Sequence, residues 1–183
     1  MHRILTGQVL LILCCITYLI WWYRGFRPGV NVSRVGGMNG ALLLITAVLG
    51  IAGIMFSVLS DGKETAPAKI SPQLITAAGI AAYIAFLLIT SFLFDRVITT
   101  ELILIVGWTA LEMQVINRLN AMGNLSDGQF LVMCAIIAAA FVISMVLYVA
   151  YYRMDEMRAF YMAMVPLVTE ALSMGILVCL ARQ

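Results

Sequence analysis

Three glutamates lie inside long apolar segments of this sequence. Glu101 and Glu112 belong to TTELILIVGWTALEMQVINRL, residues 99–119, and Glu170 belongs to FYMAMVPLVTEALSMGILVCLARQ, residues 160–183. A carboxylate surrounded by hydrocarbon costs about 2.5 kcal/mol or more, so such residues normally face a cavity or a partner. No basic residue is predicted deep in any apolar segment, so no counter-ion is evident. The glutamates therefore indicate a proton carried by the protein, a bound cation, or a cationic or hydroxylated solute.

The spacing within the first segment places Glu101, Trp108 and Glu112 on one stripe of a helix. At about 100° per residue, the three side chains fall within about 20° of one line. The two carboxylates are then about 16 Å apart along the axis, too far for a catalytic pair. Glu101, in the first turn, also has a simpler interpretation as an interfacial residue that complements the helix dipole. Trp108 is expected either to stack on a ring or cation or to pack as an ordinary membrane tryptophan.

Glu170 follows Pro166 by four residues and precedes Ser173 by three. Proline lacks a backbone N–H and leaves the carbonyl one turn earlier without its helical donor, so we expect a kink there. A kink beside a carboxylate and a hydroxyl predicts a polar pocket or a water-filled crevice. In the alternative interpretation, Glu170 is structural and hydrogen-bonded to a neighbouring helix, for example to Gln114 or Asn117.

Residue types and spacing thus predict a substrate-binding site rather than a catalytic one. Its predicted residues are Glu112, Glu170, Trp108, Ser173 and Glu101. The sequence has no HExxH motif, no GxSG motif with a membrane histidine and no paired aspartate motif, and His2 is the only histidine. We therefore predict no catalytic residue, no metal site and no cofactor. The cysteines show no metal-ligand spacing and are interpreted as small buried hydrophobes: Cys14, Cys15, Cys134 and Cys179.

The composition shows which elements must position these residues. Of the 183 residues 63% are hydrophobic and 11% charged, and the mean hydropathy is +1.04. A single soluble core could not bury so much apolar surface. A helix of about 20 apolar residues crosses a bilayer core of about 30 Å. Six segments qualify, at about 6–23, 39–60, 73–94, 97–119, 129–152 and 159–181.

We therefore predict an all-α integral membrane protein, a six-helix transmembrane bundle with short loops that forms a single domain over residues 1–183. We expect it in a plasma or inner membrane as a multi-pass protein. The net charge of +2 comes from scattered residues without a basic run, which excludes nucleic acid as a partner. The partners expected are the lipid bilayer, a small polar or cationic solute or a proton, and another membrane protein subunit.

Small residues predict how the bundle packs, because helices in lipid associate where small side chains allow close backbone approach. The second, third and fifth spans are rich in glycine and alanine, so we expect them to form the centre. The sequence FDRV at 94–97 predicts either a tight hairpin between the third and fourth spans or one bent helix with an exposed Asp95–Arg96 pair, and residues 60–72 form a polar linker.

The function predicted from these features is small-solute transport, by a carrier or by a membrane-embedded substrate-binding subunit that uses intramembrane carboxylates. The alternative is an accessory or regulatory subunit of a larger membrane complex, in which a basic residue of a partner neutralises Glu112 or Glu170. A third interpretation is an intramembrane enzyme that modifies a lipid with a glutamate as acid or base.

Overall fold

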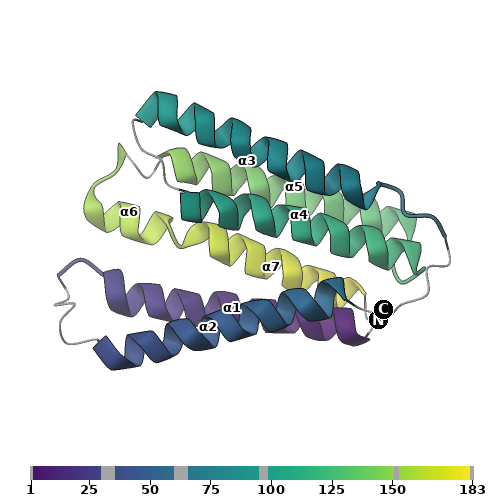
Figure 1. Ribbon diagram of the computed structural model, residues 1–183, viewed down its shortest axis with the longest axis horizontal. Coiled ribbons are helices and arrows are strands. Elements are labelled where there is room, and N and C mark those ends of the chain that lie inside the picture. Colours follow the sequence, from purple (N-terminus) through teal and green to yellow (C-terminus); the bar gives the residue numbers. More distant parts are fainter. Residues whose placement is uncertain (1, 30–35, 60–65, 95–98, 151–152, 182–183) are drawn as a thin grey trace.

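The computed structural model describes residues 2–29, 36–59, 66–94, 99–150 and 153–181 and consists of helices joined by short connections (Figure 1). The helices are α1 (His2–Phe26), α2 (Gly36–Val58), α3 (Pro72–Phe94), α4 (Thr99–Ala121), α5 (Asp127–Ala150), α6 (Glu156–Met162) and α7 (Val165–Leu180). Six helical spans are long and apolar enough to cross a membrane, with α6 and α7 together forming the sixth. The chain is a polytopic membrane protein, and the predicted all-α six-helix fold is confirmed.

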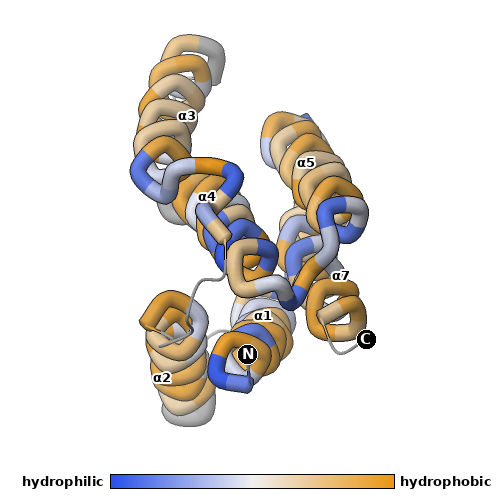
Figure 2. Tube along the Cα trace, turned by 90° about the vertical axis from the view of Figure 1, so that its right-hand side faces the viewer, coloured by the Kyte–Doolittle hydropathy of each residue, from blue (hydrophilic) through white to orange (hydrophobic). Residues whose placement is uncertain are grey.

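The bundle is centred on α4, not on the alanine- and glycine-rich helices. α4 packs against α3 and α5 and also reaches α7 and α2, and α7 in turn packs against α1 and α5. Figure 2 shows α2 and α3 at two edges of the bundle. The buried share of the span is 50% for α4 and 11% for α3, the highest and lowest of the six.

The prediction that the second, third and fifth spans form the centre is therefore wrong. α4 is the least apolar of the six spans. Polar side chains are most costly in contact with lipid, so the helix that carries most of them lies inside. Small residues permit close packing, but they do not decide which helix is surrounded by others.

Close backbone approach does occur between α1 and α2, which have the most extensive contact in the bundle. A Cβ on Gly7 would lie 2.7 Å from the backbone nitrogen of Ser57 and 2.8 Å from the carbonyl oxygen of Gly53. Gln8, fully buried on α1, donates from Nε2 to Ser57 Oγ at 3.4 Å. The two helices are therefore held together by glycine packing and by polar contacts, which also include Thr46 Oγ1 donating to Thr17 Oγ1 at 3.0 Å.

The sixth span is divided into two helices by a short turn at Ala163 and Met164, and is called the broken sixth span below. α6 ends at Met162, α7 begins at Val165, and Pro166 lies in the first turn of α7. Proline suits this position because the N–H groups of a first turn have no helical acceptor. The hydroxyl of Thr169 donates to the Pro166 carbonyl at 2.7 Å, a local side-chain bond within the first turn of α7. The predicted effect of Pro166 is therefore present as a local interruption at Ala163 and Met164, whose backbone stays in the right-handed helical region.

The linker between α2 and α3 is fastened to α4 at its described end. Asn117, which is buried, accepts a hydrogen bond from the backbone nitrogen of Ile70 at 3.1 Å and donates to the carbonyl of the same residue. Ala66 donates to the carbonyl of Ala121 at 3.0 Å. The predicted FDRV hairpin or bend falls largely on residues 95–98, outside the described residues.

Candidate functional site

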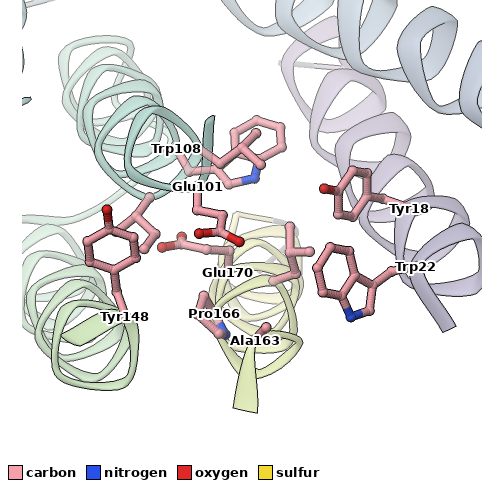
Figure 3. Close-up of a pocket in the computed structure, with 11 residues that line it drawn as sticks. Tyr18, Trp22, Glu101, Trp108, Tyr148, Ala163, Pro166 and Glu170 are labelled. Atoms are coloured by element: carbon pink, nitrogen blue, oxygen red, sulfur yellow. The ribbon is translucent and has the colours of Figure 1, made fainter. Parts of the chain in front are cut away.

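A pocket lies between α1, α4, α5 and the broken sixth span, at the end of the bundle where α4 begins and α1 ends (Figure 3). Its polar and aromatic lining comes from α1, α4, α5 and α7, and Ala163 and Pro166 at the break and apolar residues of α4 and α7 complete the wall. The lining residues are Tyr18, Trp22, Glu101, Leu104, Ile105, Trp108, Tyr148, Ala163, Pro166, Leu167 and Glu170. Three of the five predicted site residues, Glu101, Trp108 and Glu170, therefore lie on the wall of one pocket.

Glu170 is the least satisfied polar group in this wall. Its side chain is 2% exposed, and neither carboxylate oxygen has a hydrogen-bond partner among the described residues. Buried polar atoms in native proteins almost always have a partner, so an exception points to a bound group or a functional role. The alternative interpretation paired Glu170 with Gln114 or Asn117, but Gln114 donates to Thr76 at 3.0 Å and Asn117 bonds the backbone of residue 70. That pairing is wrong because both amides face the α3 side of α4.

Aromatic rings surround the two carboxylates of the pocket. Tyr18 and Trp22, one helical turn apart on α1, stand on one side, Tyr148 of α5 on another and Trp108 beside Glu101 (Figure 3). The indole nitrogens of Trp22 and Trp108 are buried and have no hydrogen-bond acceptor among the described residues. The pocket therefore combines unsatisfied acceptors on Glu170 with unsatisfied donors on Trp22 and Trp108.

Glu112 and Ser173 form a second polar group deeper in the bundle. Ser173 Oγ donates to the two carboxylate oxygens of Glu112 at 2.9 and 2.8 Å and to the carbonyl of Glu170 at 2.8 Å. All three side chains are at most 2% exposed. A hydroxyl carries one proton, so it satisfies only one of these three acceptors at a time. Glu112 does not line the pocket, but through Ser173 it is joined to the helix turn that carries Glu170.

Beyond Glu112 the bundle is closed by apolar side chains. Residues of α1, α4, α5 and α7 pack there into one core cluster, which includes Ile4, Val115, Ile116, Leu119, Met133 and Leu177. The polar groups therefore extend inward from one end of the bundle and stop at a packed apolar layer. An ion or polar solute could pass from the pocket to the other end of the bundle only if the packed side chains of this apolar layer moved apart.

The free volume of the pocket is about 40 Å³. That is room for about three water molecules, or for one small polar head group, but not for a large solute. A ligand of drug size would need α1 or the broken sixth span to move.

Sequence reasoning missed Tyr18, Trp22 and Tyr148. Trp22 belongs to an aromatic cluster at the end of the first span, which is typical of an interfacial anchor, and Tyr148 lies in an otherwise apolar segment. The spacing of Tyr18 and Trp22, four residues apart on one helix face, was the available signal. It does not reveal that this face meets Glu101 and Glu170.

No protein-family model matches the chain, and no curated protein or solved structure resembles it significantly. The chemistry of the site therefore has to be argued from its own residues. Within the described parts of the chain, no three His, Cys, Asp or Glu side chains gather where they could hold a metal ion. What the arrangement offers is a carboxylate for a cation or hydrogen-bond donor, an indole N–H for an acceptor, and rings for packing.

Proposed function

We propose that the chain is a small-solute carrier, or the membrane-embedded substrate-binding subunit of one, and that the pocket between α1, α4, α5 and the broken sixth span is its binding site. The observation that carries the proposal is the Glu170 carboxylate, which is buried at the pocket wall with neither oxygen hydrogen-bonded within the described structure. A proton, a cation or a polar solute would supply what this group lacks.

The broken sixth span supports the proposal independently. Irregular backbone within a membrane is tolerated where it is buried in protein or lines a cavity. In many transporters, discontinuous helices form the substrate site. Here the residues at the break, Ala163 and Pro166, line the same pocket as Glu170.

The arrangement of polar and apolar layers also suits a carrier. The pocket opens at one end of the bundle, and the apolar cluster around Ile116 and Leu177 fills the other. Alternating access requires a site that is reached from one side at a time, with a barrier that can separate on the other. The Glu112–Ser173 pair lies between the pocket and this barrier, where it would be exposed next if the layer opened.

Native mass spectrometry of the gently purified protein tests the proposal. We expect a small-molecule adduct on the parent chain that disappears in Glu170→Gln and weakens in Glu112→Gln. Glu156→Gln is the matched control, because Glu156 is an exposed carboxylate on α6 outside the pocket. The mass of the adduct then limits the identity of the solute. Uptake of that solute into proteoliposomes distinguishes a carrier from a subunit that only binds.

Two results would contradict the proposal. One is an adduct of equal intensity in the parent chain and in Glu170→Gln, which would place the ligand elsewhere. The other is a co-purifying membrane protein without any adduct, whose retention depends on Glu170 or Glu112. That outcome would identify the carboxylates as docking groups of an accessory subunit.

A further inference from the structure

The pocket wall carries unsatisfied groups of two kinds, and together they specify a ligand. Glu170 presents two buried acceptor oxygens without donors, and Trp22 and Trp108 each present one buried donor without an acceptor, in each case among the described residues. All three side chains line the same pocket, and Figure 3 shows Glu170 and Trp108 on adjacent sides of it. A complementary ligand therefore carries donors with positive charge and, beside them, an acceptor.

We propose that the ligand group held here is a primary ammonium with a neighbouring oxygen, as in an amino alcohol such as ethanolamine. This inference rests on the proposed function and names the ligand class of the same site. The ammonium lies against Glu170, and the oxygen accepts from Trp108 Nε1.

The aromatic lining fits the charge of this group. Tyr18, Trp22, Trp108 and Tyr148 approach the pocket from α1, α4 and α5. Aromatic faces attract cations at distances up to about 6 Å from the ring centroid, and more strongly where water is excluded. A second carboxylate, Glu101, lines the same wall.

Donor count and size favour a primary over a quaternary ammonium. Both oxygens of Glu170 need donors, and a primary ammonium has three N–H groups, whereas a quaternary ammonium has none. The free volume of about 40 Å³ also suits a small head group. A metal cation would satisfy Glu170 but would leave the Trp108 N–H without an acceptor.

Titration calorimetry on the full chain in lipid-free micelles tests the inference with four probes: ethanolamine, ethylamine, tetramethylammonium and ethylene glycol. We expect ethanolamine to bind about fivefold more tightly than ethylamine, the difference that one neutral hydrogen bond makes. Tetramethylammonium should bind more weakly than ethylamine, and ethylene glycol should give no binding heat. Equal binding of ethylene glycol and ethanolamine would overturn the inference.

Two variants assign the contacts. Glu170→Gln should weaken both amines more than tenfold, because charge-assisted hydrogen bonds are the stronger ones. Trp108→Phe keeps an aromatic ring but removes the N–H, so ethanolamine should lose its advantage while ethylamine affinity stays within about twofold. Glu156→Gln should change neither. An unchanged ethanolamine affinity in Glu170→Gln overturns the inference; should that variant not fold, the four-probe series on the parent chain still decides.

The same head group can come from a free amine or from phosphatidylethanolamine. Native mass spectra after addition of phosphatidylethanolamine or phosphatidylglycerol separate these sources. A phosphatidylethanolamine adduct that Glu170→Gln abolishes identifies the lipid, and ethanolamine binding without such an adduct identifies a free amine. If no amine or amine lipid binds but another Glu170-dependent solute adduct is present, the ligand class is wrong and the proposed function stands. If no probe binds in calorimetry and no adduct of any kind is found, both fail.

Discussion

Replacing Glu170 by methionine should stabilise the ligand-free protein while it removes ligand binding. The side chain is 2% exposed and neither oxygen has a described hydrogen-bond partner. Burying a polar group without a hydrogen bond costs about 1–3 kcal/mol on the scale of protein mutations. Methionine has a similar length, is flexible enough to fill the same space, and is compatible with the apolar Leu167, which lines the same pocket. The expected gain in unfolding free energy is therefore about 1–3 kcal/mol.

Thermal unfolding in detergent, followed by circular dichroism, measures this effect without relying on the fluorescence of the two tryptophans in the pocket, Trp22 and Trp108. For a chain of this size, 1 kcal/mol corresponds to roughly 2–4 °C, so the midpoint should rise by about 2–12 °C. Native mass spectrometry of the same sample should show no solute adduct. Gain of stability with loss of function is the usual pattern where a binding site holds an unsatisfied group.

The control is Glu156→Met, which makes the same chemical change at an exposed position and should move the midpoint by less than about 2 °C. A drop of more than about 1 kcal/mol in Glu170→Met, with the control unchanged, would refute the reasoning. It would mean that the carboxylate supports the fold through a partner of its own.

Three further perturbations test the surroundings of the site. Ser173→Ala removes the hydroxyl that donates to the Glu112 carboxylate and should lower the unfolding free energy by about 1–3 kcal/mol in the same thermal assay; an unchanged midpoint would show that Glu112 has another donor. Gly7→Val should push α1 away from α2 and lower the unfolding free energy by at least about 1–3 kcal/mol, because its Cβ would meet backbone atoms of Ser57 and Gly53. The control is Gly107→Ala, whose Cβ would meet nothing within 4 Å and which should be neutral or slightly stabilising. Equal losses of stability in the two variants would contradict the packing argument. Asn117→Ala should release the linker end from α4 and raise hydrogen exchange at residues 66–71 by about tenfold relative to α5, and unchanged exchange there would show that other contacts hold the linker.

The sequence by itself determined the class of fold. Spans of about 20 apolar residues must satisfy their backbone internally in lipid, which leaves helices as the only solution for segments of this length and pattern. The sequence also indicated the unusual residues, because glutamates in apolar segments need a reason, and Pro166 marked the place where the sixth span is interrupted. These inferences use only properties local to one segment.

Only the tertiary structure decided which helix lies in the centre and which residues share a pocket. Small-residue content predicted the wrong centre, because close packing and encirclement by neighbours are different properties. The link between Glu112 and Ser173 and the meeting of Tyr18 and Trp22 with Glu170 depend on the rotation of separate helices about their axes. That rotation is set by the packing of all helices at once, so no single segment of sequence records it.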